Sequence, residues 1–206
     1  MATIRTVGHG TLEADAFADL LRGAGVEGLW DVRRYPGSHR HPHFASDAMA
    51  RWLPDRGVGY RHEPALGGRR KPAPDSPHVG LRNEQFRAYA DHLTSAEFTD
   101  ALGGLVDAGG GQRLAVMCAE SLWWRCHRRL VADHLVLVEG IEVEHLFHDG
   151  RLAPHSPTPE ARAVDGAVVY DVGFQGSLMG DDATADADTD GRWGRAGDGV
   201  SRARRR

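Results

Sequence analysis

Short apolar runs alternate with segments of helical spacing through the first 150 residues, and this alternation is the strongest constraint on the fold. We predict strands at residues 3–7, 27–32, 58–60, 114–118 and 141–147, and helices at about 12–22, 46–56, 83–93, 95–106 and 122–138. The run at 114–118 has no polar side chain apart from its terminal thiol, which is typical of a central strand covered on both faces. The alternation predicts an α/β fold, a mostly parallel sheet flanked by helices on both faces.

Helix ends and loops leave local signals in the sequence. Thr11, Asn83 and Ser95 each precede a helical segment and are candidate N-caps, because their side-chain oxygens can accept hydrogen bonds from free backbone N–H groups. Gly23 and Gly25 are expected to end the first helix. Residues 64–80 are rich in proline and glycine, which predicts an exposed loop.

The chain changes character after residue 175. Residues 176–206 contain almost no apolar side chains, so we predict one α/β domain at 1–175 and a disordered low-complexity tail at 176–206. The longest apolar runs fall far short of the roughly 20 residues that span a bilayer. The N-terminus shows no apolar signal core, and two cysteines do not make a disulfide framework. We expect a cytoplasmic protein without a membrane partner, and the sequence leaves its oligomeric state open.

The net charge of −4 hides three clusters of basic residues. The clusters are Arg33, Arg34 and Arg40; Arg61, Arg69, Arg70 and Lys71; and Arg125, Arg128 and Arg129. If these clusters meet in the folded chain, they form a cationic surface suited to phosphates or nucleic acid. DNA is therefore a candidate partner, with scattered, solvated arginines as the alternative.

Ionisable residues stand at the carboxyl ends of several predicted strands. His9 follows the first strand, Asp31 and Arg33 end the second, and Cys118 and Glu120 end the strand at 114–118. In open α/β sheets, ligands bind in the crevice outside these carboxyl ends. We therefore expect the working site at this edge of the sheet.

Two of these residues each allow two interpretations. Asp31 stands in an apolar strand, and it serves either acid–base chemistry or a fixed ion pair with Arg33, which points to the same face. Cys118 faces a helix start and nearby arginines, and it is either a nucleophile with a lowered pKa or a small buried hydrophobe. Glu120 is favoured near a helix start by the helix dipole alone.

Further candidates follow Glu120 in the chain. Cys126, His127 and Arg128 fall in the first turns of the predicted helix, where Arg128 could bind a carboxylate or phosphate through two hydrogen bonds. Trp123 could offer a flat surface to a base, with packing as the alternative. The histidines at 39, 41 and 43 and the two cysteines match no closed zinc pattern, so we assign neither a metal site nor a cofactor.

Taken together, these motifs resemble a known family. They are TVGHG at residues 6–10, DVRRYPGS at 31–38, MCAE at 117–120, CHRRL at 126–130 and VEHL at 143–146. In this order they are similar to the domain of unknown function 488 family over about residues 3–150. The resemblance implies an α/β fold with its polar residues at one sheet edge, and a connection with DNA base processing. Gly10 departs from the pattern, since a serine is common there.

The first functional hypothesis is an enzyme acting on nucleic acid, a hydrolase of the N-glycosylase type in DNA repair. It would excise a modified pyrimidine such as 5-hydroxymethylcytosine. Asp31 would stabilise the oxocarbenium-like sugar or activate water, and Glu120 would orient its neighbours. The predicted substrate-binding residues are His9, Arg33, Tyr35, Ser38, Arg128 and Trp123, with His127 near the reacting groups.

Two alternatives remain open at this point. One is a small-molecule enzyme in which Cys118 is the nucleophile and Glu120 and His127 support it. The other is a non-catalytic module in which the same residues capture an anionic ligand or nucleic acid.

Overall fold

The computed structural model describes residues 3–37 and 40–172, and it is built around a six-stranded sheet. The strands lie in the order β3-β2-β4-β1-β5-β6, and all neighbours are parallel except the β5–β6 pair. Their bounds are β1 Thr3–Gly8, β2 Gly28–Asp31, β3 Gly59–His62, β4 Leu114–Cys118, β5 Glu142–Leu146 and β6 Leu152–Pro154. A separate antiparallel hairpin joins β7 Ala161–Val164 to β8 Ala167–Tyr170.

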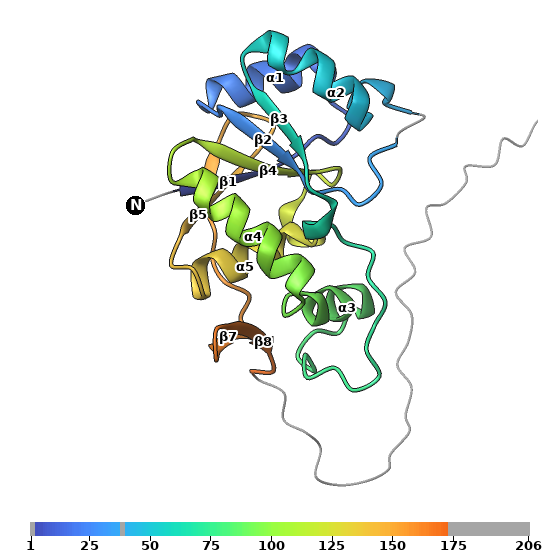
Figure 1. Ribbon diagram of the computed structural model, residues 1–206, viewed down its shortest axis with the longest axis vertical. Helices are drawn as coiled ribbons and strands as arrows, with labels where there is room; N and C mark the ends of the chain where they lie inside the picture. The colour runs from blue at the N-terminus through green and yellow to red at the C-terminus, as the bar shows by residue number, and fades with distance from the viewer. Residues whose placement is uncertain (1–2, 38–39, 173–206) are drawn as a thin grey trace, which may run out of the picture. The chain divides into compact units, whose positions relative to one another are not determined.

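Helices cover both faces of the sheet, as predicted (Figure 1). Helices α1 Ala14–Gly23 and α2 Ser46–Trp52 pack on one face, while α3 Glu84–His92, α4 Ala96–Gly109 and α5 Arg128–Leu137 pack on the other. The central strand β4 shows why two cores form: Ala115 and Met117 face the first core, and Val116 and Cys118 face the second. The sequence prediction of a buried central strand is confirmed.

The helix termini follow the capping signals in part. The Asn83 side chain accepts hydrogen bonds from the N–H groups of Gln85 and Phe86, and the Ser95 hydroxyl accepts one from Phe98. The prediction for Thr11 was wrong, because α1 begins at Ala14 after Glu13 and has no side-chain cap.

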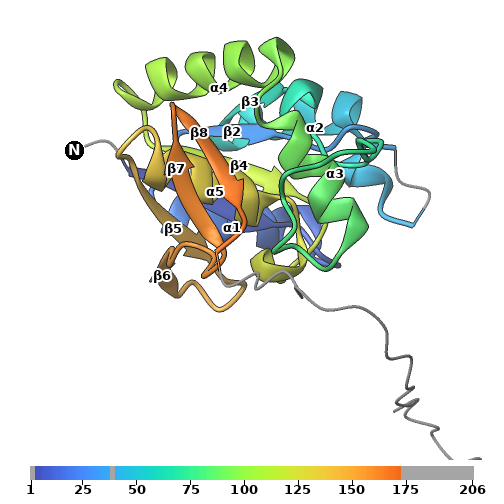
Figure 2. The same ribbon diagram turned by 90° about the horizontal axis from the view of Figure 1, so that it is seen from below.

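The connection between β4 and α5 differs from the prediction in a way that matters for the site. The predicted helix at about 122–138 is a single 3₁₀ turn at Trp123–Arg125, followed by α5 from Arg128. Cys126 and His127 therefore precede the helix and lie on the irregular segment that faces the carboxyl ends of the strands. The chain also continues past β5 into the β7–β8 hairpin, which Figure 2 shows against α5.

Parts of the sequence predictions lie outside the described residues, namely the prediction for residues 176–206 and the candidate residue Ser38. Within the described part of the chain, no helix is both long and apolar enough to cross a bilayer.

Candidate active site

A cavity of about 430 Å³ opens beside the carboxyl ends of β2 and β4. Its lining residues come from the β2 and β4 ends, the loop after η3 (Pro64–Leu66), helix α3 and the segment before α5. They are Arg33, Arg34, Tyr35, Gly68, Arg69, Gln85, Phe86, Tyr89, Cys118, Ala119, Glu120, Arg125, Cys126 and His127. The volume suits a small-molecule ligand or a single base. The cavity therefore lies at the edge of the sheet where the sequence led us to expect a site.

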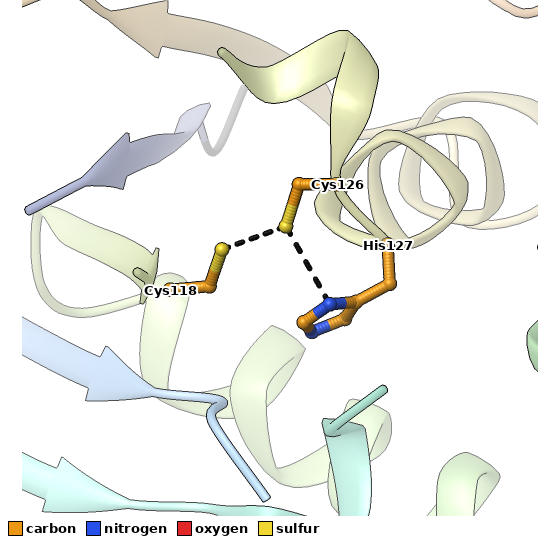
Figure 3. A group of neighbouring side chains, drawn as sticks. All are labelled: Cys118, Cys126 and His127. Atoms are coloured by element: carbon orange, nitrogen blue, oxygen red, sulfur yellow. Dashed lines mark hydrogen bonds between the residues drawn. The ribbon is translucent and has the colours of Figure 1, made fainter. Parts of the chain in front are cut away.

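Two thiols meet in the wall of this cavity (Figure 3). The Sγ atoms of Cys118, at the end of β4, and Cys126, in the segment before α5, lie 2.6 Å apart. Both cysteines are free and buried, and the backbone N–H of Glu120 also donates to the Cys118 sulfur at 3.3 Å. The two sulfurs are therefore in direct contact and act as one coupled unit.

Burial, the hydrogen bond within the pair and the buried guanidinium of Arg128 together set how this pair ionises. Burial opposes ionisation of Cys126, but the hydrogen bond with Cys118 and the charge of Arg128 outweigh it and lower the pKa of Cys126 to about 6. Burial and the hydrogen bond with Cys126 raise the pKa of Cys118. Burial alone would lower the pKa of Arg128, yet the two sulfurs raise it. These shifts favour a single thiolate in the pair at neutral pH, with Cys126 as the sulfur that carries it.

Arg128 is anchored from two sides. It is 1% exposed, and its Nη2 donates to the carbonyl oxygen of Glu120 while its Nη1 reaches the Thr6 hydroxyl at 3.5 Å. Close packing holds the same carbonyl in place: a Cβ on Gly8 would lie 1.9 Å from the Glu120 oxygen. Only glycine fits where β1 passes this loop, so the loop and the arginine keep their positions.

His127 flanks the thiolate on its other side. Its Nδ1 lies 3.5 Å from the Cys126 sulfur, and its ring packs against Tyr89 of α3 with centroids 5.0 Å apart. Burial lowers the pKa of His127 and raises the pKa of Tyr89, so both are neutral at pH 7. A Cβ on Gly68 would approach His127 Nδ1 to 3.0 Å, which makes this glycine part of the site's shape.

The mouth of the cavity is cationic. Arg34, Arg69 and Arg125 line it, and among the described residues none of the three has a carboxylate partner. The Arg34 guanidinium lies over the ring of Tyr35, which is 66% exposed. Glu120 is the single carboxylate among the lining residues. An anion entering this mouth meets an excess of positive charge.

Asp31 and Arg33 form an enclosed ion pair beneath the cavity. Arg33 Nε and Nη2 donate to the two Asp31 carboxylate oxygens at 2.8 and 2.5 Å, and the Tyr60 hydroxyl donates at 2.8 Å. Asp31 is fully buried and does not line the cavity. Of the two sequence interpretations, this geometry corresponds to the fixed pair that orders the loop.

His9 belongs to the same enclosed group. Its Nε2 lies 3.2 Å from Arg33 Nη1, its Nδ1 lies 2.9 Å from the Gly10 carbonyl, and its ring stacks on Phe44. Burial, and then the charge of Arg33, lower its pKa from 6.5 to about 4. A neutral His9 that donates from Nδ1 and accepts at Nε2 satisfies both contacts.

Trp123 serves packing and a buried polar network instead of the cavity. Its ring stacks on His145 with centroids 3.9 Å apart, and it is absent from the cavity lining. His145 Nδ1 pairs with the Thr6 hydroxyl at 2.7 Å, and its Nε2 pairs with His155 Nδ1 at 2.9 Å. His155 Nε2 then donates to Asp133 at 2.9 Å. This network continues from Thr6 to Arg128.

The structure thus brings together Cys118, Glu120, His127, Arg33 and Tyr35 at one cavity. It places Asp31, His9, Arg128 and Trp123 outside the lining, with Arg128 directly behind the sulfurs. Sequence reasoning did not propose Cys126 as a catalytic residue. The signal was present: the two cysteines stand on either side of one strand-to-helix connection, eight residues apart.

A metal ion is the other group that this cluster could hold. Ligand atoms of Cys118, Cys126 and His127 lie within 4.8 Å of one another. Two thiolates on a tetrahedral zinc with bonds of about 2.3 Å lie roughly 3.8 Å apart, so these sulfurs, at 2.6 Å, would have to separate to admit the ion. Arg128 also faces the sulfurs and repels a second cation. We therefore interpret the cluster as a thiol pair.

Comparison with known proteins agrees with the motifs. A relative, cobyric acid synthase of Streptomyces coelicolor (strain ATCC BAA-471 / A3(2) / M145), is 34% identical over 107 residues. The match covers 52% of this chain and 19% of that protein, so the chain spans about a fifth of its length. No solved structure matches the chain. The family model described as "Domain of unknown function DUF488" matches residues 13–135, and the chain therefore belongs to that family.

Proposed function

We propose that this protein is a thiol-dependent enzyme that transfers a group from a small anionic substrate through Cys126. One observation carries the proposal: a buried pair of sulfurs lies against a buried arginine, in the wall of a cavity whose mouth is lined with arginines. Structural cysteines are usually inert, whereas a reactive cysteine needs a positive environment and access to a ligand. Both conditions hold here.

Each residue has a definite task in this proposal. The Cys126 thiolate attacks the electrophilic carbon or phosphorus of an ester, a bond from sulfur to that atom forms, its bond to the ester oxygen breaks, and the leaving oxygen takes a proton from water. The S–H of Cys118 and the charge of Arg128 stabilise the thiolate before attack. Arg34, Arg69 and Arg125 hold the anionic part of the substrate. Water then cleaves the covalent intermediate.

The charge preference of alkylation tests this assignment. Iodoacetate is an anion and iodoacetamide is neutral, so the ratio of their alkylation rates reports how strongly the site attracts anions. We expect this ratio to be roughly tenfold higher for Cys126 than for free cysteine, because the cationic mouth concentrates anions. The double variant Arg69→Ala with Arg125→Ala should lose this preference, and so should added salt. Arg51→Ala is the matched control, because the Arg51 side chain on α2 is 72% exposed and does not line the cavity. This variant should keep the preference for iodoacetate. If the ratio of the two rates in the unaltered protein equals the ratio for free cysteine, the cavity is not an anion-binding site with a nucleophile.

Excision of a modified base from DNA is the second candidate, and the mouth of the cavity favours it. Exposed Tyr35 and the three arginines could stack a base and bind phosphates. The carboxylate for such a reaction would be Glu120, which lines the cavity, since Asp31 is enclosed by Arg33 and Tyr60. A salt-titrated binding assay on plain and base-modified DNA, read with base release, separates the candidates. Salt-sensitive binding followed by release of one base supports excision. A protein that does not bind DNA even at low salt excludes this candidate.

A further inference from the structure

The two sulfurs of the active-site pair are already placed for a bond to each other. They are the only two cysteines of the chain, and their Sγ atoms are 2.6 Å apart. A disulfide has an S–S length of about 2.05 Å, so the two atoms need to approach by roughly half an ångström. Figure 3 shows the side chains pointing at one another from β4 and from the segment before α5.

Access to the pair is selective for small reagents. Cys118 is 4% exposed and Cys126 5% exposed, yet both line the cavity. A peroxide can therefore reach the sulfurs from the cavity, while the thiol of a second protein is kept away by the walls. The partner nearest to an oxidised Cys126 is Cys118, and this arrangement favours an internal disulfide over a mixed one.

We propose that hydroperoxides oxidise this pair to a Cys118–Cys126 disulfide, and that the disulfide is a reversible off state of the enzyme. The off-state function depends on the proposed function, whereas formation of the disulfide does not. A bond between the sulfurs removes the nucleophile and leaves Arg128 without its thiolate partner.

The chemistry balances in two steps. The Cys126 thiolate attacks the terminal oxygen of the hydroperoxide, an S–O bond forms, and the O–O bond breaks. The departing alkoxide, or hydroxide from hydrogen peroxide, takes a proton and leaves Cys126 as a sulfenic acid. The Cys118 sulfur then attacks the Cys126 sulfur, the S–O bond breaks, and the hydroxide leaves as water with the Cys118 proton. Overall, two thiols and one hydroperoxide give one disulfide, one alcohol or water, and one further water.

Hydrogen peroxide and the full-length protein supply the test. The reduced protein is treated with hydrogen peroxide in the presence of a chelator, so that no metal ion shields the sulfurs. We expect each chain to lose both free thiols and the mass of two hydrogen atoms, and a peptide map to join Cys118 to Cys126 within one chain. Iodoacetate labelling should disappear with the thiols, and dithiothreitol should restore both.

Two variants separate the steps. Cys118→Ser should stop at the sulfenic acid, which dimedone traps at Cys126, and Cys126→Ser should resist peroxide. The proposal is overturned if both thiols survive peroxide that oxidises a free dithiol in the same tube. It is also overturned if the product is a sulfinic acid or a disulfide between two chains. Because the charge preference of alkylation is measured on reduced protein, failure of the proposed function shows in that assay and not in the peptide map.

Discussion

Replacement of Arg128 with methionine is expected to raise the pH midpoint of Cys126 ionisation from about 6 to at least about 8.5. The hydrogen bond with Cys118 and the charge of Arg128 together outweigh the burial of Cys126, so without Arg128 burial keeps the thiol protonated. In the unaltered protein the thiolate is present above pH 6 and is lost as the pH falls below it. In the variant the thiolate at pH 6 should fall by more than about 100-fold, from about one half of the molecules.

The measurement for Arg128→Met is the alkylation rate of Cys126 as a function of pH. The rate will fall by less than the thiolate fraction, because a thiol with a higher pKa is intrinsically more nucleophilic. The midpoint is therefore the reliable readout. Arg125→Ala is the matched control: Arg125 lines the exposed mouth of the cavity, where solvent screens it, so this variant should keep a midpoint near 6. An unchanged midpoint in a folded Arg128→Met protein would show that the arginine does not set the ionisation.

Asp133→Asn is expected to lower the free energy of unfolding by about 3–5 kcal/mol, because it replaces a buried carboxylate that accepts several hydrogen bonds with a neutral amide. Asp133 is fully buried on α5. Its two carboxylate oxygens accept from His155 Nε2, the Thr158 N–H and hydroxyl, and the Tyr170 hydroxyl, at 2.6 to 3.0 Å. All four are donors, and an amide nitrogen at that position presents further hydrogens to them.

The physical reason extends beyond the carboxylate itself. A donor direction runs from Thr6 to His145, then to His155, then to Asp133, since the carboxylate can only accept. Burial, and then electrostatic interactions with His155 and Arg128, lower the pKa of His145 to about 3, so the ring stays neutral in this chain. Loss of the Asp133 carboxylate, the last acceptor in this chain of hydrogen bonds, therefore disturbs the residues that are bonded to α5, the helix that begins with Arg128.

Urea unfolding measures the effect of Asp133→Asn. Asp107→Asn, on the exposed surface of α4, is the matched control and should change the free energy of unfolding by no more than about 0.5 kcal/mol. A loss of less than about 1 kcal/mol for Asp133→Asn would mean that the network rearranges around the amide.

Much of the fold could be predicted because it depends on local signals. The apolar run at β4 and the caps Asn83 and Ser95 are read from neighbouring residues alone. Because parallel strands end at one edge, placing Cys118 and Arg33 at strand ends was sufficient to bring them to one cavity. The β7–β8 hairpin also had a local signal, Asp165-Gly166 with positive φ at both positions, which the sequence prediction overlooked.

The remaining features depend on contacts between distant parts of the chain. The role of Asp31 follows from Tyr60, which is 29 residues away and donates to its carboxylate. The ionisation of Cys126 depends on a break in the predicted helix. The 3₁₀ turn ends at Arg125, so Cys126 lies outside a helix and its sulfur contacts Cys118 of β4. The Asp133 network joins residues from β1, β5, α5 and β8, and no pattern within a short window encodes that meeting.

The central claim is that the sulfur pair holds one thiolate at neutral pH, and titration of thiolate ultraviolet absorbance tests it directly. The groups that face Cys126 are Cys118 from β4, Tyr89 from α3, and His127 and Arg128 from its own segment. We predict one thiolate per chain with a midpoint near pH 6, absent in Cys126→Ser, and no second thiolate up to at least the ordinary thiol range of about 8.5. Two thiols that both ionise only above about pH 8.5 would contradict the account, because Arg128 would then fail to stabilise a thiolate at neutral pH.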